Sequence, residues 1–158
     1  MSTQRPPATA PDGAGRRVGV VAARYHGEVV ERLLDGALAA LARCGVAGDA
    51  VEVVRVPGAW EIPLALEALA RRGGWDALVA LGAVIRGETA HFEYVAGECS
   101  RGVAEVALRH ALPIGFGVLT CEDLEQARAR AGGPAGDKGE EAALAALEMA
   151  GILARLRG

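Results

Sequence analysis

A short apolar run that leads at once into a glycine-containing turn and a helical pattern sets the fold of this chain. The run ALVAL at residues 77–81 lies between Asp76 and Gly82. An uninterrupted run of this length is typical of a strand that is buried on both faces of a parallel sheet. Because apolar residues recur at helical spacing over residues 95–107, residues 82–94 predict a strand-to-helix crossing at the carboxyl edge of the sheet. Open α/β folds bind their ligands at that edge.

The same alternation of strand and helix patterns runs along the rest of the chain. Strands are predicted at residues 18–21, 51–56, 77–81 and 114–119, helices at about 30–41, 63–72, 95–110, 121–130 and 140–157, and a glycine-rich turn at 132–139. Thr120 is predicted to cap the fourth helix. This order predicts an α/β three-layer sandwich, with a four-stranded parallel sheet flanked by helices on both faces. Because four strands make a narrow sheet, we expect other subunits to cover its edges and its apolar helices.

Length and composition are typical of one domain. Half of the 158 residues are hydrophobic, so residues 16–158 are expected to form a single α/β domain with a sizeable core. Residues 1–15 consist mostly of Pro, Ala, Gly, Ser and Thr, and we expect them to form a flexible N-terminal tail.

Charge and residue usage argue against several classes of function. The formal net charge is −3, and no basic patch with interleaved aromatic residues is present, which argues against nucleic-acid binding. No apolar run reaches membrane-spanning length and no signal peptide is visible, so we expect no membrane association. The three cysteines form no CxxC pair, which favours reduced thiols and a cytoplasmic location. The histidines have no metal-ligand spacing with the cysteines, so we expect no metal site.

Aromatic side chains gather at the predicted ligand edge. Tyr25 and His26 follow the first strand, Trp60 and Glu61 follow the second, and Phe116 lies in the fourth. Three of the six aromatic residues are therefore at or near this edge, which suggests a stacking site for a flat ring. The carboxylate of Glu61 can accept hydrogen bonds from ring N–H groups. Two simpler interpretations stay open: the aromatic residues pack in the core, and Glu61 is an acid in the first turn of a helix.

The turn after the third strand combines features of an anion site with a proton carrier. Gly87 lets the backbone approach a ligand closely, and Thr89 with the free N–H groups of the helix start can bind an anion. His91 is the residue type best suited to proton transfer near neutral pH. Arg130, just before the glycine-rich turn, and Lys138, within it, are candidate phosphate contacts. The simpler interpretation is a Thr-capped helix with a solvated histidine and two solvated cations.

These segments, in this order, resemble the lumazine synthase family of riboflavin biosynthesis. The resemblance runs from about Val18 to the C-terminus. It is carried by RYH at 24–26, VPGAWEIP at 56–63, GAVIRGETAHFEY at 82–94, GVLT at 117–120, EQA at 125–127, RAG at 130–132 and DKG at 137–139. Each segment alone is a weak signal, but together and in register they are highly specific.

The resemblance implies a reaction and an assembly. The reaction is the condensation of two small molecules, 5-amino-6-(D-ribitylamino)uracil and 3,4-dihydroxy-2-butanone 4-phosphate, without a metal or an organic cofactor. The assembly is a homopentamer, which in many members closes into an icosahedral shell, and riboflavin synthase is a candidate partner.

The resemblance also implies a role for each site residue. His91 is the catalytic proton carrier, the phosphate-binding set is Gly87, Glu88, Thr89 and Arg130, and the substrate-binding set is Tyr25, His26, Ala59, Trp60, Glu61, Val84, Ile85, Phe116 and Lys138. Tyr25 is expected to stack on the pyrimidine, and the adjacent subunit is expected to supply Phe116, Arg130 and Lys138. Many members have Asn at the position of His26.

Two other functions fit part of the pattern. A non-catalytic flavin or lumazine binder, or a shell protein that has lost activity, would use the edge aromatic residues and Glu61. Such a protein has no need of a phosphate-binding cation such as Arg130 or of a proton carrier such as His91. A flavodoxin-like FMN protein would need a phosphate loop after the first strand, where Tyr25 and His26 stand. The chain also contains no GxGxxG motif, which argues against a standard dinucleotide site.

Overall fold

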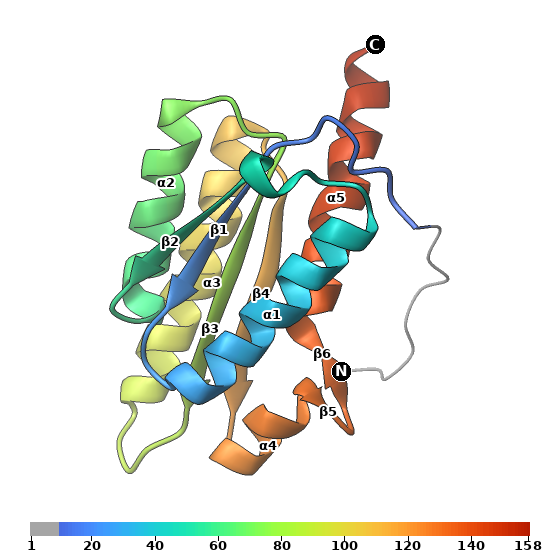
Figure 1. The fold of residues 1–158 in the computed structure, drawn as a ribbon. Coiled ribbons are helices and arrows are strands. Elements are labelled where there is room, and N and C mark those ends of the chain that lie inside the picture. Colours follow the sequence, from blue (N-terminus) through green and yellow to red (C-terminus); the bar gives the residue numbers. More distant parts are fainter. Residues whose placement is uncertain (1–9) are drawn as a thin grey trace.

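A four-stranded parallel sheet forms the centre of the protein. The computed structural model describes residues 10–158. The sheet is built from β1 (Val18–Ala23), β2 (Val51–Val56), β3 (Ala77–Ile85) and β4 (Ile114–Cys121). Their order is β2-β1-β3-β4, and every neighbouring pair is parallel, as predicted (Figure 1). The two central strands are almost wholly buried, which explains their unbroken apolar sequences.

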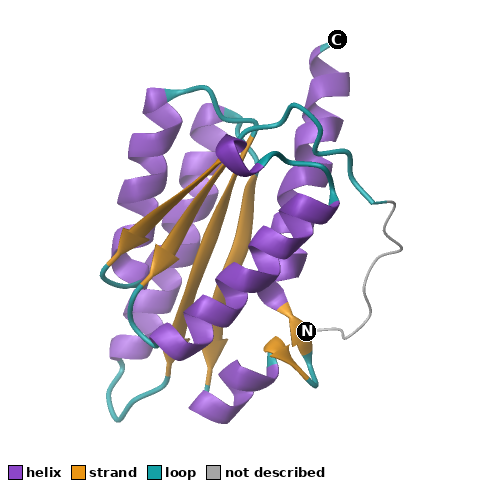
Figure 2. Cartoon of the chain, viewed as in Figure 1, coloured by secondary structure: helices purple, strands orange, loops and turns teal. Residues whose placement is uncertain are grey.

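Helices cover both faces of the sheet, which confirms the predicted three-layer sandwich (Figure 2). One face carries α1 (Gly27–Arg43) and α5 (Lys138–Arg157), and the other carries α2 (Ile62–Arg72) and α3 (His91–His110). Successive residues of β3 alternate between the two layers, so Val79 packs with α1 and α5 while Leu78 packs with α2 and α3. Each layer therefore has its own apolar core, separated by the sheet.

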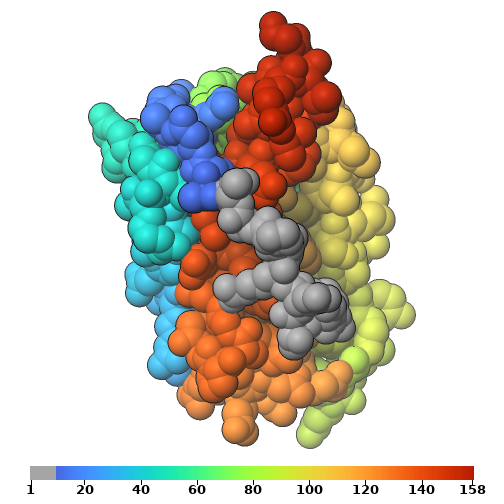
Figure 3. Space-filling view, turned by 90° about the vertical axis from the view of Figure 1, so that its right-hand side faces the viewer, coloured from blue at the N-terminus to red at the C-terminus, as the bar shows by residue number. Residues whose placement is uncertain are grey.

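Two glycines let α5 pack closely against its neighbours. A Cβ atom at Gly139 would lie 1.9 Å from the carbonyl oxygen of Leu33 in α1, and a Cβ atom at Gly115 in β4 would lie 2.0 Å from that of Ala142. Neither position has room for a side chain, so the backbone of α5 contacts both elements directly. The last turns of α5 project beyond the body of the molecule, at the end opposite α4 (Figure 3).

The predicted cap of the fourth helix is wrong. Thr120 lies within β4, because β3 runs on to Ile85 and the pairing of the two strands continues with it. The helix α4 (Leu124–Ala129) is capped instead by Asp123, whose Oδ1 accepts a hydrogen bond from the backbone N–H of Gln126 at 2.8 Å. A β-branched residue such as Thr suits a strand, and this long-range pairing outweighs its preference for a cap.

The predicted glycine-rich turn is a short antiparallel hairpin. It consists of β5 (Ala131–Gly133) and β6 (Gly136–Asp137), and α5 begins directly after it. The Oδ1 of Asp137 accepts hydrogen bonds from the backbone N–H groups of Gly139 at 2.9 Å and Glu140 at 3.1 Å. This cap starts the helix two residues before the predicted position.

Two further segments complete the described chain. Residues 1–9 of the predicted tail lie outside the described residues, while the backbone N–H of Gly13 donates to the carbonyl oxygen of Cys44 at 2.8 Å. Two 3-10 turns, η1 (Gly48–Ala50) and η2 (Ala59–Glu61), precede β2 and α2. Between residues 10 and 158, no helix combines the length and the apolar character needed to span a membrane.

Candidate active site

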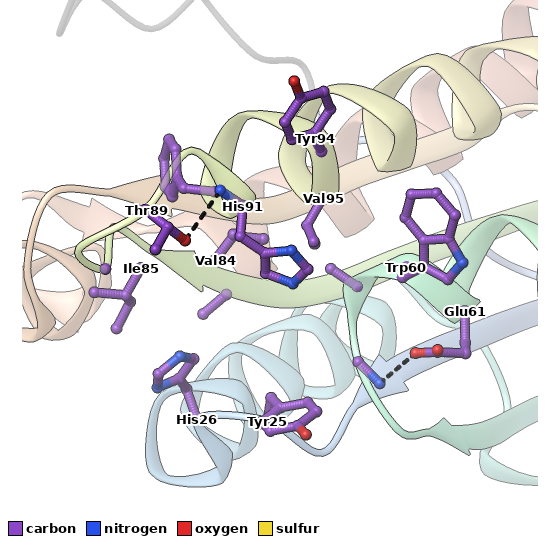
Figure 4. A pocket seen from close by; sticks show the side chains of 15 residues that line it. Tyr25, His26, Trp60, Glu61, Val84, Ile85, Thr89, His91, Tyr94 and Val95 are labelled. Atoms are coloured by element: carbon purple, nitrogen blue, oxygen red, sulfur yellow. Dashed lines mark hydrogen bonds between the residues drawn. The ribbon is translucent and has the colours of Figure 1, made fainter.

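A pocket of about 940 Å³ opens at the carboxyl ends of β1, β2 and β3 (Figure 4). It is lined by Tyr25, His26, Gly58, Ala59, Trp60, Glu61, Ala83, Val84, Ile85, Gly87, Thr89, His91, Phe92, Tyr94 and Val95. Ten of the fourteen predicted site residues are in this set. The parallel sheet brings them together, because its strands all end at the same edge.

The turn after β1 supplies one wall. The backbone N–H of Tyr25 donates to the carbonyl oxygen of Pro57 at 3.1 Å, which ties this turn to the end of β2. Tyr25 is 71% exposed, so its ring is available to a ligand. His26 adopts a left-handed backbone conformation (φ 54°, ψ 47°) at the start of α1. This conformation is costly for a residue with a Cβ atom and is found preferentially at functional sites.

The turn η2 supplies a second wall with an aromatic ring and a carboxylate. Trp60 is 57% exposed. Glu61 is partly buried, and its Oε2 accepts a hydrogen bond from the backbone N–H of Gly58 at 2.9 Å (Figure 4). Glu61 therefore starts a helix, as the simpler interpretation of its sequence position predicted, and it also lines the pocket. A Cβ atom at Gly58 would lie 2.9 Å from Cδ2 of Tyr25, so glycine leaves the room that the tyrosine ring needs.

The end of β3 and the start of α3 supply the third wall. Val84 and Ile85 are the last residues of β3, and the exposed turn that follows carries Gly87 and Thr89. His91 is the first residue of α3 and is exposed, and its backbone N–H donates to the Thr89 hydroxyl oxygen at 3.4 Å. The N-terminus of this long helix carries a partial positive charge. The wall can therefore offer a ligand an anion site beside an imidazole.

Four predicted site residues do not line this pocket: Glu88, Phe116, Arg130 and Lys138. Glu88 is exposed on the turn after β3, and Phe116 is 45% exposed on the edge strand β4. The Nη1 of Arg130 donates to the carbonyl oxygen of Gln126 at 3.0 Å, at the end of α4. Figure 1 places α4 and the β5–β6 hairpin at the same end of the sheet as the pocket, on the side of α1 and α5. One chain therefore does not bring Arg130 into its own pocket.

Sequence reasoning missed several pocket residues. Phe92 and Tyr94 add two aromatic rings from the first turns of α3, and Gly58 and Ala83 add backbone surface. The available signal was the position of both aromatic residues within three residues of His91, at the end of the predicted strand-to-helix crossing. Within the described part of the chain, no cluster of three or more His, Cys, Asp or Glu side chains could hold a metal ion.

Comparison with known proteins agrees with this geometry. The family model described as 6,7-dimethyl-8-ribityllumazine synthase matches residues 15–154. The 6,7-dimethyl-8-ribityllumazine synthase of Desulfovibrio desulfuricans is 49% identical over 156 residues, which cover 99% of this chain and 100% of the relative. The match spans every element that builds the pocket, so this chain belongs to the 6,7-dimethyl-8-ribityllumazine synthase family.

Proposed function

We propose that this chain condenses 5-amino-6-(D-ribitylamino)uracil with 3,4-dihydroxy-2-butanone 4-phosphate to give 6,7-dimethyl-8-ribityllumazine, the penultimate step of riboflavin biosynthesis. The observation that carries the proposal is the pocket itself. It joins surfaces for a flat ring, a carboxylate, an imidazole and a helix N-terminus in one cavity. The family membership of the chain supports the same reaction.

The two ends of the pocket suit the two substrates. In Figure 4, Trp60 and Glu61 lie at one end, Thr89 lies at the other, and the imidazole of His91 lies between them. We assign the pyrimidine to the first end, where Tyr25 stacks on its ring and Glu61 accepts hydrogen bonds from its N–H groups. The phosphate lies at the second end, near Gly87, Glu88 and Thr89.

The reaction is a series of proton transfers around one ring. The uracil amine attacks the ketone carbon, and loss of water forms a Schiff base. Loss of a proton from the neighbouring carbon then expels inorganic phosphate and leaves an enol. Protonation of its terminal carbon converts the enol hydroxyl into a new carbonyl group, and attack by the ribitylamino nitrogen on this carbonyl closes the ring and releases a second water. His91 can take and return the protons. Holding the two reactants in one cavity contributes a large share of the rate, because it converts a bimolecular step into a unimolecular one.

The remaining site residues come from a neighbouring subunit in this proposal. Arg130, Lys138 and Phe116 complete the phosphate and pyrimidine contacts across the interface of a homopentamer. The single chain leaves large apolar side chains uncovered, with Leu64 of α2 76% exposed and Leu108 of α3 84% exposed. Exposed apolar groups of this kind support contact with other subunits.

We further propose that the pentamers close into an icosahedral shell and that riboflavin synthase is a partner. The support is the short segment from Arg130 to Lys138, a length that shell-forming members share. Light scattering in buffers with and without phosphate tests the assembly, and a particle of pentamer size in both buffers would exclude the shell. The unpaired Cys44, Cys99 and Cys121 support a cytoplasmic location.

The activity is tested by mixing the purified protein with both substrates and following lumazine fluorescence. We expect fluorescence to appear only when both substrates are present. A non-catalytic binder would quench or shift the fluorescence of added lumazine but would form none from the substrates.

A further inference from the structure

Arg86 is the first residue after β3, and its side chain reaches across the turn that carries the proposed phosphate contacts. Its backbone N–H donates to the carbonyl oxygen of Cys121 at 2.9 Å, so the sheet holds its main chain. Its Nε donates to Oε2 of Glu122 at 2.7 Å, and its Nη1 donates to Oε1 of Glu93 at 2.5 Å. Its Cζ lies 4.4 Å from the centroid of the Phe92 ring. One guanidinium therefore joins the ends of two strands to the first turn of α3.

Arg86 contacts Phe92 and Glu93 of α3, which come immediately after the proposed proton carrier, His91. Phe92 also lines the pocket, so the guanidinium and the pocket share this ring. The connecting turn, residues 86–90, is exposed throughout, and the hydrogen bond from the His91 backbone to Thr89 is long at 3.4 Å. The Arg86 side chain thus links the first turn of α3 to the carboxyl ends of β3 and β4 through hydrogen bonds to Glu93 and Glu122.

The charge state of this link is well defined. Hydrogen bonds to Glu93 and Glu122 raise the pKa of Arg86, and the hydrogen bond from Arg86 lowers the pKa of Glu93. Hydrogen bonds between charged groups are shorter and stronger than neutral ones. The planar guanidinium can bond two carboxylates while it lies flat on a ring, which the ammonium group of a lysine cannot do.

We propose that Arg86 is a positioning residue, whose guanidinium holds the first turn of α3 so that the His91 imidazole meets the substrates in a fixed orientation. The inference rests on the proposed function. Arg86 is not among the residues that line the pocket, so it acts through Phe92 and Glu93. A variant that lacks the Arg86 guanidinium still has the His91 imidazole, but the first turn of α3 is no longer held in one position.

If Arg86 served only to stabilise the fold, its replacement would lower the unfolding temperature and would not lower kcat more than replacement of a comparable arginine elsewhere. Exposed ion pairs contribute little to folding stability, and the Arg86 side chain is 38% exposed. Arg72 is a matched control, because it pairs with Glu52 and its guanidinium lies 5.3 Å from the centroid of the Trp75 ring. Arg72 ends α2, at the amino end of the sheet and away from the pocket.

The test compares kcat, KM for both substrates and the unfolding temperature of Arg86→Gln, Arg86→Lys, Arg72→Gln and the wild type. We expect Arg86→Gln to lower kcat by on the order of 10- to 10²-fold, because displacing a catalytic group by about 1 Å costs that much. The KM for the pyrimidine should stay within about threefold of the wild-type value, because Arg86 makes no contact that binds the substrate in the ground state. Arg86→Lys should recover part of the loss, and Arg72→Gln should keep the wild-type kcat. The unfolding temperatures of all four proteins should agree closely.

A double variant sharpens the test. If Arg86 acts through Glu93, Arg86→Gln/Glu93→Gln should lose no more kcat than the more affected single variant. A wild-type kcat in Arg86→Gln, or a loss equal to that of Arg72→Gln, overturns the inference. If Arg86→Gln does not fold, the test uses Arg86→Lys and Glu122→Gln. A wild-type kcat in both of these variants would then overturn the inference that Arg86 positions His91. A wild-type protein that forms no lumazine refutes the proposed function and this inference together, so the two failures are distinguishable.

Discussion

Two inactive variants of this chain should restore each other's activity when they share a pentamer. His91 lines the pocket of its own chain, whereas Arg130 does not. Arg130 follows α4, and its guanidinium donates a hydrogen bond to the carbonyl oxygen of Gln126. If the proposed shared site is correct, each complete site takes its imidazole from one subunit and its guanidinium from the next. A ring of this kind repeats one heterologous interface.

Each variant alone is expected to be nearly inactive. His91→Ala should lower kcat by on the order of 10²- to 10⁴-fold, the usual contribution of a general acid–base group. Arg130→Gln removes a charged hydrogen bond of roughly 1.5–3 kcal/mol, which is about 10- to 10²-fold in phosphate affinity. The assay should therefore use the butanone phosphate below its KM, where both losses are fully expressed.

The variants are unfolded, mixed in equal amounts and refolded together. A site works when an Arg130→Gln subunit supplies the His91 side and a His91→Ala subunit supplies the Arg130 side. Random mixing makes this arrangement in roughly a quarter of sites, so lumazine fluorescence should recover to about a quarter of the wild-type rate. Each variant refolded alone measures the residual activity.

A second mixture separates the two readings of the site. When wild type is mixed equally with the double variant His91→Ala/Arg130→Gln, a shared site again leaves roughly a quarter of sites intact, whereas a site within one subunit leaves about half. Recovery in the first mixture no greater than the mean of the two parents, with about half activity in the second, would refute the shared site. Native mass spectrometry must show mixed rings in both cases.

Three further predictions concern phosphate binding, backbone strain and acid stability. Arg130→Gln should weaken inhibition by inorganic phosphate by about 10- to 10²-fold and leave pyrimidine affinity nearly unchanged, and equal inhibition constants would contradict the assignment. His26→Gly should raise the free energy of unfolding by about 1 kcal/mol, because glycine relieves the left-handed backbone, while substrate affinity falls; a variant that is no more stable than wild type in urea titrations would refute the strain argument. Hydrogen bonds from Arg71 and then His110 lower the pKa of Glu67 from 4.5 to about 2. The stability from this carboxylate is complete above pH 4.5 and is lost as the pH falls towards 2, so the stability difference between wild type and Glu67→Gln should shrink in this window, and a constant difference would exclude the linkage.

The sequence by itself determined the fold class and the edge at which the pocket forms. Hydrophobic periodicity is local, so the apolar run at 77–81 and the helical pattern at 95–107 predict a strand and a helix without any tertiary information. Right-handed crossovers then place all strand ends at one edge. Tyr25, Trp60 and His91 meet there for that reason, although they lie far apart in the chain.

Tertiary structure alone decided where the elements end and which side chains meet. The pairing of Ile85 with Cys121 extends β3 past its apolar run and keeps Thr120 in a strand, because ladder hydrogen bonds between distant segments leave no mark in a local pattern. The direction of α3 turns Phe92 into the pocket, and only packing sets that direction. The same holds for the contacts of Arg86, whose partner Glu122 is brought to it by the pairing of β3 with β4.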